Sequence, residues 1–342
     1  MNPVLSVSLF PAGPWRIGPD SGARNQVDSI YHSDSMYAAV TSALTRLGLL
    51  EEWLDATARN GLPAVCFSSC FPLVDGVAYV VPPRTLWPPS STALLAAHVR
   101  WKSARYVPLE MVRVLLAGQP LDENQWTVDA VSGCLLPVGS PGPWRTGVRA
   151  NAALDRLTGA AERHSTACIE FRPGVGLWAL VSFADDAARD RWSDPLKTAF
   201  RLLADSGFGG ERSRGWGRCE PPAFTEGALP ELILGAPPTE SPEAPAGNGA
   251  HPQWLLSLFS PAAADAVDWD RGNYSVLERA GRVESPVRWG ELKKHVNMVS
   301  EGSVLYAASA LRGAAPDVAP DGFAHPVFRA GFAVAVPLPE VS

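Results

Sequence analysis

The chain has 342 residues, and its 29 Lys and Arg against 35 Asp and Glu give a formal net charge of −6. This length predicts two domains. The acidic balance argues against a protein that coats nucleic acid through bulk charge, but it leaves room for a local basic groove. The five cysteines form no CxxC pair, and the sequence has no secretory signal and no apolar run that could cross a membrane. We therefore expect a cytoplasmic protein with reduced thiols.

The first half of the chain alternates strand and helix patterns. The expected elements are a strand at Val4–Phe10, a loop at Gly13–Asn25, a helix from Ser33 or Asp34 through Leu50, a strand pair within Pro63–Pro83 that turns at Asp75-Gly76, paired strands at Ala167–Phe171 and Leu177–Phe183, and a helix at Asp185–Ala204. Residues 84–165 have no clear order. This succession predicts an α+β fold with a ferredoxin-like sheet that carries its helices on one face.

The second half begins after a stretch rich in Pro, Ala, Gly and Glu. We expect an N-terminal domain at 1–233, a linker or exposed loop at 234–252 and a smaller C-terminal domain at 253–342. The predicted strands of the C-terminal domain are Trp254–Phe259, Asn273–Leu277, Ser303–Ala308 and Val327–Val336, with a turn at Ala280-Gly281.

One segment has the composition of an RNA-binding loop. Five glycines and three arginines occur in Gly207-Phe-Gly-Gly-Glu-Arg-Ser-Arg-Gly-Trp-Gly-Arg218. Glycines allow close approach of the backbone to a ligand, exposed N–H groups bind anions, and arginine holds phosphate bidentately. The Trp216 ring would offer a stacking face for a base. A structural turn that merely caps the preceding helix is the alternative.

Two better-known glycine loops do not fit this segment. A Walker A loop ends in Gly-Lys-Ser/Thr, which is absent from the chain, and a dinucleotide-binding loop follows a strand rather than a helix. Metal-ligand patterns such as HExxH and paired Cys–His are also absent, so we expect neither a cofactor nor a metal. Basic residues cluster around Arg105 and again between Arg271 and Lys294.

An ordered series of segments resembles one protein family. The series comprises His32-Ser-Asp-Ser-Met-Tyr-Ala-Ala, Phe67-Ser-Ser-Cys-Phe-Pro72, Pro82-Pro83, Asp155-Arg-Leu-Thr-Gly159, the glycine-rich loop, Tyr274-Ser-Val-Leu-Glu-Arg-Ala-Gly281, Glu301-Gly-Ser303 and Gly331-Phe-Ala-Val-Ala-Val-Pro337. It is similar to the RAMP superfamily of type III CRISPR systems, and within it to the fourth subunit of the type III-A Csm interference complex. Arg84 stands where that group is expected to have a lysine.

The resemblance implies two modified ferredoxin-like (RRM-like, RAMP) domains, the glycine-rich loop and a β-hairpin thumb, which we place within residues 84–150. It implies a non-catalytic subunit in antiviral defence that caps the 5′ handle of the crRNA. The implied partners are the large polymerase/HD subunit, the first backbone subunit and, indirectly, target RNA. The expected RNA-binding residues are His32, Ser33, Asp34, Arg105, Arg149, Gly207, Gly209, Gly210, Arg212, Ser213, Arg214, Gly215, Trp216, Arg218, Arg282, Lys293 and Lys294.

Three alternatives stay open on the sequence alone. His32 could act as the acid or base of a metal-independent endoribonuclease that processes precursor crRNA. Asp34 could serve metal-dependent cleavage of target RNA, although His32 and Asp34 could equally order the loop and cap the first helix. A scaffold without RNA contact would leave the three arginines of the glycine-rich loop unexplained.

Overall fold

The computed structural model describes residues 2–19, 22–89, 100–235, 249–285 and 289–339. Its main sheet lies in the N-terminal half, has seven strands and contains only antiparallel pairs. Across the sheet the order is β11 (Ala223–Leu229), β1 (Asn2–Leu9), β10 (Val175–Phe183), β3 (Phe71–Val74), β4 (Val77–Val80) and β5 (Val107–Pro108), while β2 (Val65–Phe67) also pairs with β10.

Five α-helices occur in the described residues: α1 (Ser33–Arg46), α2 (Leu50–Ala56), α3 (Leu109–Leu116), α4 (Asp186–Ser206) and α5 (Glu231–Leu234). The helix predicted to continue through Leu50 ends at Arg46 instead. Gly48 has a φ of 77°, and the Leu49 N–H donates to the Leu44 carbonyl at 2.9 Å, which closes the helix C-terminus. The prediction of the second helix is confirmed by α4, where the Asp185 side chain accepts from the Ala188 N–H.

Two of the helices, α1 and α4, lie in the connections between strands of the main sheet. Along the chain the elements β1, α1, β2, β10, α4 and β11 follow one another, and the sheet places β11, β1, β10 and β2 side by side. This is a mixed α/β arrangement with two helical connections.

The predicted turn at Asp75-Gly76 is confirmed, because both residues have positive φ (50° and 83°) between β3 and β4.

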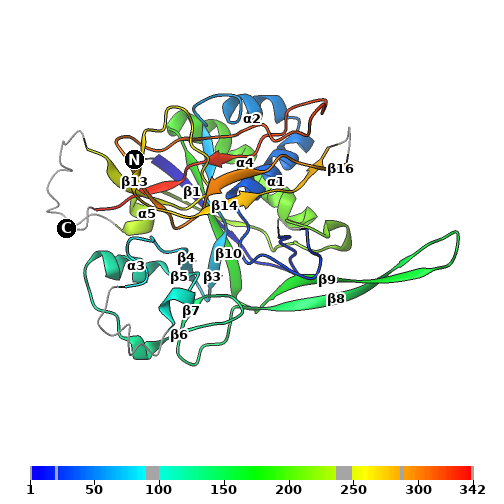
Figure 1. The fold of residues 1–342 in the computed structure, drawn as a ribbon, viewed down its shortest axis with the longest axis horizontal. Coiled ribbons are helices and arrows are strands. Elements are labelled where there is room, and N and C mark those ends of the chain that lie inside the picture. Colours follow the sequence, from blue (N-terminus) through cyan, green and yellow to red (C-terminus); the bar gives the residue numbers. More distant parts are fainter. Residues whose placement is uncertain (1, 20–21, 90–99, 236–248, 286–288, 340–342) are drawn as a thin grey trace.

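A long β-hairpin projects away from the body of the molecule (Figure 1). Its strands, β8 (Trp144–Leu154) and β9 (Ala161–Phe171), pair over their full length. The predicted pairing of the strand ending at Phe171 with β10 is therefore wrong. At the tip, the Asp155 carboxylate accepts from the Leu157 N–H at 2.9 Å, and the Leu157 side chain is 97% exposed. The hairpin starts near the end of the window 84–150 in which the thumb was expected.

The segment between β4 and β8, which the sequence left without order, forms a small lobe. It contains α3, β5 and the hairpin of β6 (Trp126–Val128) and β7 (Leu135–Pro137). Leu109, Met111 and Val112 of α3 are buried, and Tyr106 with Val107 continues this core toward the main sheet.

The C-terminal half is built from strands. A four-stranded sheet has the order β13 (Val267–Asn273), β18 (Val304–Ala307), β12 (His251–Leu255) and β21 (Ala335–Pro337). Three pairs accompany it: β14 (Val276–Arg279) with β17 (Val296–Val299), β15 (Arg282–Glu284) with β16 (Trp289–Leu292), and β19 (Gly313–Ala314) with β20 (Gly331–Phe332). The described residues beyond 248 contain no helix, so this half lacks the two helices of a ferredoxin-like unit.

Of the predicted C-terminal strands, Ser303–Ala308 is confirmed by β18, and the others are shifted or divided; Trp254–Phe259 overlaps only the end of β12. The predicted strand Asn273–Leu277 spans the break between β13 and β14, and Val327–Val336 is divided between β20 and β21. The turn at Ala280-Gly281 does join β14 to β15, although each of these strands pairs with a later one.

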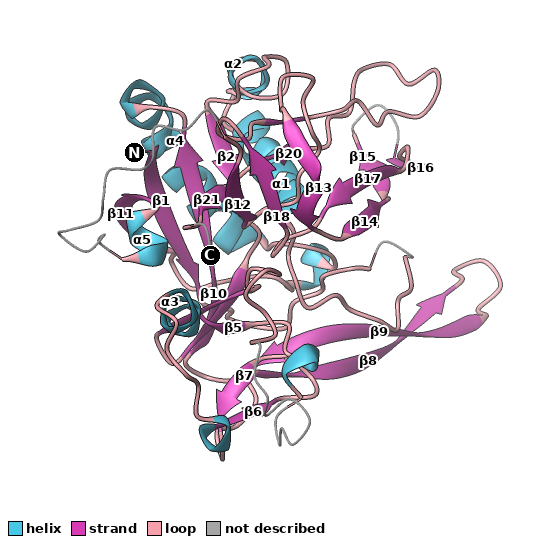
Figure 2. Cartoon of the chain, turned by 60° about the vertical axis from the view of Figure 1, so that its left-hand side comes forward, coloured by secondary structure: helices cyan, strands magenta, loops and turns pink. Residues whose placement is uncertain are grey.

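One hydrophobic cluster contains residues of both halves, and a smaller one lies within the C-terminal half. Trp254 is fully buried, and its indole N–H donates to the Val81 carbonyl at 3.1 Å. The Ser69 N–H donates to the Leu256 carbonyl at 2.9 Å. Figure 2 shows the C-terminal strands beside the N-terminal sheet and helices. The division at 234–252 stays a prediction, and most of that segment (236–248) lies outside the described residues. None of the helices that can be described has the length and apolar character needed to span a membrane.

Candidate functional site

The N-terminus of α1 holds a buried ionic cluster. Arg279 donates to both carboxylate oxygens of Asp34, at 2.9 and 3.0 Å, and Arg329 pairs with the same carboxylate. Asp34 is 5% exposed. Burial alone would raise the pKa of Asp34, but the two guanidinium groups hold it well below its usual range. Asp34 therefore binds two arginines of the C-terminal half to the N-terminal half.

A second buried pair lies beside the first. His32 Nδ1 donates to the Glu301 carboxylate at 2.7 Å, and the Ser69 hydroxyl donates to the same oxygen. His32 Nε2 lies 3.5 Å from Asp28. Burial would lower the pKa of His32, but Glu301 and Asp28 raise it to about 9. The His32 side chain is thus a cation at neutral pH, held in place by two carboxylates.

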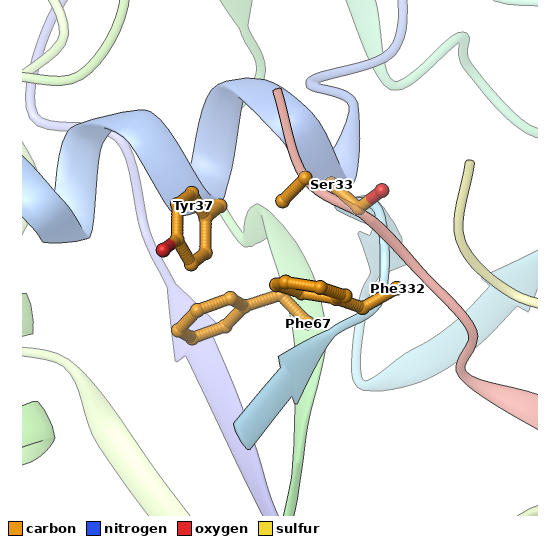
Figure 3. Close-up of a pocket in the computed structure, with 5 residues that line it drawn as sticks. Ser33, Tyr37, Phe67 and Phe332 are labelled. Atoms are coloured by element: carbon orange, nitrogen blue, oxygen red, sulfur yellow. The ribbon is translucent and has the colours of Figure 1, made fainter. Parts of the chain in front are cut away.

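Ser33 completes the connection between the halves. Its N–H donates to Ser69 Oγ at 2.9 Å, and its own hydroxyl accepts from the Leu258 N–H at 3.0 Å. Figure 3 shows Ser33 and Tyr37 on α1 above the rings of Phe67 and Phe332, and the space between these residues has no room for a water molecule. The Tyr37 and Phe332 ring centroids lie 5.7 Å apart.

The structure gives the segment His32–Asp34 a role that the sequence did not predict. All three residues are buried, so RNA contact by Ser33 and Asp34 stays a prediction that their burial does not favour. The predicted helix cap is present only in part: His32 occupies the N-cap position without a capping hydrogen bond, whereas the Asp34 carboxylate accepts from the Ser35 N–H of the first turn at 2.7 Å. The two oxygens of Asp34 are occupied by arginines, which speaks against a metal-ligating role. In the part of the chain with described coordinates, no group of three potential ligands could hold a metal ion.

The glycine-rich loop, residues 207–218, uses its backbone for internal contacts. The Gly210 N–H donates to Arg16 O, the Gly217 N–H to Pro14 O and the Phe208 N–H to Gly217 O, each at 2.9 Å. These N–H groups are therefore not available as the anion site that the sequence suggested. Arg16 itself is buried and donates to four backbone carbonyls, which fixes the segment under the loop.

The glycines of this loop are needed for packing within the protein. A Cβ at Gly217 would lie 1.9 Å from the Phe208 carbonyl oxygen, and one at Gly209 would lie 2.4 Å from the Arg16 carbonyl oxygen. At Gly210 a Cβ would make only ordinary contact, at 3.4 Å, with the Arg16 side chain. The Trp216 side chain is 9% exposed, which leaves little ring surface for stacking with a base.

The arginines of the loop differ in their surroundings. Arg212–Arg214 forms one 3-10 turn, with Ser213 between the two arginines. Arg214 pairs with Glu211 at 3.0 Å. The loop lies near the ionic cluster, because the ring of Tyr31, next to His32 in the chain, packs edge-on against Phe208 with centroids 6.1 Å apart.

A cavity of about 250 Å³ opens next to the His32–Glu301 pair. Its lining includes His32, Glu301 and Arg105 and comes from both halves of the chain. Arg105 donates to Ser29 Oγ at 2.7 Å and lies 3.5 Å from Asp28. Burial opposes the charge of Arg105, yet its anionic neighbours raise its pKa, so it remains a cation.

The other predicted RNA-binding residues lie elsewhere. Arg149 is on β8 and pairs with Glu170 of β9. Arg282 begins β15, where its guanidinium donates to the Gly290 carbonyl at 2.5 Å. Lys293 follows β16, and Lys294 pairs with the exposed Asp321 at 2.7 Å. The structure thus groups His32 with Arg105, keeps the glycine-rich loop nearby, and sets the hairpin and the β15–β16 region apart.

The comparisons with known proteins agree with this architecture. Residues 248–338 match the family described as the CRISPR Csm4 C-terminal domain. The strand-rich C-terminal half is thus similar in sequence to that domain.

Solved structures share the fold of the whole chain. A chain of the crystal structure of the Csm1–Csm4 cassette in complex with cA4 is 18% identical with a TM-score of 0.57, and 99% of each chain is covered. A chain of the Csm3–Csm4 subcomplex of the type III-A interference complex is 14% identical with a TM-score of 0.63, with 99% of this chain and 100% of that chain covered. No curated protein matches significantly. The resemblance to Csm4 is confirmed: the chain is Csm4-like in sequence over residues 248–338 and in fold over almost its whole length.

Removing the Asp34 carboxylate should destabilise the protein strongly. Asp34→Ala leaves Arg279 and Arg329 buried without their common partner, and we expect a loss of about 3–5 kcal/mol in the free energy of unfolding. Urea unfolding measures this change in the free energy of unfolding. Asp321→Ala, which removes the exposed partner of Lys294, is the control and should leave the midpoint unchanged. Equal midpoints for the two variants would contradict the structural role of Asp34.

The charge of His32 should make stability fall at alkaline pH. Its pKa is about 9 in the folded protein and near 6.5 when unfolded, so the folded state holds the proton more tightly. The contribution of His32 is complete below about pH 6.5 and is lost as the pH rises through 9. Urea unfolding at a series of pH values should show this slope. His32→Gln should flatten it, whereas exposed His295→Gln should retain it; a flat wild-type curve would refute the assignment.

The glycines of the loop should differ in their tolerance of alanine. Gly215 has a φ of 79° with open space around it, so Gly215→Ala should cost only the backbone strain of about 1–2 kcal/mol. Gly217→Ala combines a φ of 79° with the clash against Phe208 and should cost more. Thermal and urea unfolding compare the two variants, and equal losses would show that the close approach at Gly217 is unimportant.

Proposed function

We propose that this chain is the Csm4-type subunit of a type III-A CRISPR (Csm) effector complex that acts in antiviral defence in the cytoplasm. The observation that carries the proposal is the fold likeness over 99% of the chain to chains solved in a Csm1–Csm4 cassette and in a Csm3–Csm4 subcomplex. The match of residues 248–338 to the Csm4 C-terminal domain supports it from the sequence. The partners are the large polymerase/HD subunit and the backbone subunit, and the chain links the two.

Within this complex the chain binds single-stranded crRNA and caps its 5′ handle. The N-terminal half serves as a modified ferredoxin-like RAMP domain, for which the sheet order β11, β1, β10, β2 is the supporting observation. The C-terminal sheet is the reduced second domain. The β8–β9 hairpin is the thumb that separates the first guide nucleotides, because it alone among the described elements projects far from the body (Figure 1) and ends in the exposed Leu157. Contact with target RNA is indirect.

The subunit contributes RNA binding rather than catalysis. His32 as the acid or base of an endoribonuclease is disfavoured by two observations. The side chain is 3% exposed, which keeps RNA away from it, and its raised pKa leaves little of the neutral form that a base requires at neutral pH. A buried imidazole that is charged at neutral pH and bonded to Glu301 is suited to holding structure instead.

Co-expression tests the proposed function. The tagged chain, produced with the large subunit, the backbone subunit and a crRNA from one CRISPR locus, should retain all three through affinity and size-exclusion steps. Arg212→Ala with Arg214→Ala should reduce crRNA occupancy, since each charge-assisted phosphate contact contributes about 1.5–3 kcal/mol. Failure to retain either protein subunit would refute membership of the complex. Full crRNA occupancy in the double variant would remove the glycine-rich loop from the RNA site.

A further inference from the structure

The β8–β9 hairpin and the glycine-rich loop are connected through two consecutive residues, Trp15 and Arg16. On the hairpin side, the Ile169 N–H donates to the Trp15 carbonyl at 2.7 Å, and the Arg16 guanidinium donates to the Ala167 carbonyl at 2.9 Å. On the loop side, the Phe208 ring stacks on Trp15 with centroids 5.3 Å apart. The base of the hairpin is therefore packed against the loop, although the two are separate in the chain.

Arg16 is a buried cation whose bonds at the hairpin base go to neutral groups. It is 8% exposed. Its guanidinium donates, over distances of 2.9 to 3.3 Å, to the carbonyl oxygens of Ala23, Arg24, Gln26 and Ala167. Burial lowers the pKa of Arg16, and the Glu211 carboxylate of the loop opposes this shift. A buried charge is held more firmly when a carboxylate compensates it, so Glu211 supports the contact of Arg16 with the hairpin.

Glu211 has a backbone conformation that glycine would adopt without strain. Its φ is 60° and its ψ is 24°, in the left-handed region. Among the residues placed by the structure, Asp75 is the only other non-glycine residue with a positive φ. The loop uses five glycines, yet this left-handed position carries a glutamate. Local strain of this kind points to a function of the side chain.

The Glu211 carboxylate is shared between two arginines. Arg214 Nη1 lies 3.0 Å from Glu211 Oε2, and the Arg214 side chain is 39% exposed. Arg214 thus attracts the carboxylate from the surface, whereas Arg16 attracts it from the interior. A phosphate that binds Arg214 would compete with Glu211 for the same guanidinium, because both are anions that accept its N–H groups.

We propose that Glu211 couples the glycine-rich loop to the β8–β9 hairpin. When an RNA phosphate binds Arg214, the Glu211 carboxylate loses this partner and its charge is left to Arg16, which then holds the base of β9 more firmly. Glu211 and Arg16 are positioning residues, because they act on the hairpin without touching RNA. The inference rests on the proposed contact of the loop arginines with RNA, and it gives that contact a second effect, the ordering of the hairpin.

Hydrogen exchange of the ligand-free, full-length chain tests the coupling without RNA. The reporters are the backbone amides of Ala167 and Ile169, which bond to the segment that Arg16 holds. Arg214→Ala removes the competing cation, so it should slow exchange at both amides by about two- to fivefold, the range expected for a partly exposed ion pair. Arg189→Ala on α4 removes a pair of the same chain spacing and similar exposure, and should change nothing at β9. Unchanged or faster exchange in Arg214→Ala would overturn the proposal.

A charge-neutral variant distinguishes the coupling from ordinary packing of the loop. Glu211→Gln keeps the size of the side chain but removes its charge, so adding Arg214→Ala in this background should no longer slow exchange at β9. Glu211→Gly adopts the left-handed conformation without strain and provides a second background with the same expectation. If Arg214→Ala slows exchange equally in either background, Glu211 is not the coupling residue.

Repeat-derived RNA tests the trigger. Bound RNA should slow exchange at Ala167 and Ile169 in the wild type. Glu211→Gln should bind the RNA at least as tightly, because Arg214 is no longer neutralised, yet show no slowing; direct shielding by RNA would persist in both proteins. RNA that binds the wild type without slowing exchange would overturn the coupling and leave RNA binding intact. A chain that shows the ligand-free response but binds no RNA would support the coupling and refute the proposed RNA contact instead.

Discussion

The buried carboxylate of Asp34 is the constraint on which the rest of the molecule depends. A charge removed from water has to be compensated locally, and here the compensation comes from Arg279 at the end of β14 and from Arg329 just before β20. These residues are 245 and 295 positions away in the chain. Satisfying one carboxylate at the start of α1 therefore fixes where two separate strands of the C-terminal half must lie.

The same junction determines what the site can do chemically. Glu301 and Asp28 keep His32 in its charged form at neutral pH, so the imidazole contributes a positive charge and a hydrogen-bond donor there. The cavity of about 250 Å³ is lined by the His32–Glu301 pair together with Arg84 and Arg105. The charges that stabilise the contact between the halves thus also lie on the cavity wall.

The sequence was informative where structure is decided locally. The Asp75-Gly76 turn and the helix after Asp185 follow from residue preferences within a few positions, and both are present. Strand pairing was predicted less well, since the apolar run ending at Phe171 looks like any buried strand and does not reveal that β8, rather than β10, is its partner.

The candidate site was also predicted only in part, because it is formed by residues that are far apart in the sequence. Family resemblance drew attention to the segments that contain His32, Arg279 and Glu301, yet nothing in the local pattern shows that they meet in a buried cluster. No motif in the sequence singled out Arg329. The glycines of the loop were expected to allow close approach of a ligand. They instead allow close approach of the Phe208 and Arg16 carbonyl groups, which the sequence alone does not reveal.

The position of β1 in the main sheet has a consequence for synthesis of the chain. β1 precedes the other strands of the main sheet in the chain, yet it ends up between β10 and β11, which end at residues 183 and 229. Until both have been made, Val4, Leu5 and Val7, which are buried in the finished protein, have neither strand neighbour to pack against. Folding of this half is therefore dominated by non-local pairing and is completed late in translation. A product that stops short of β11 would expose the edge of β1, where association with other chains begins.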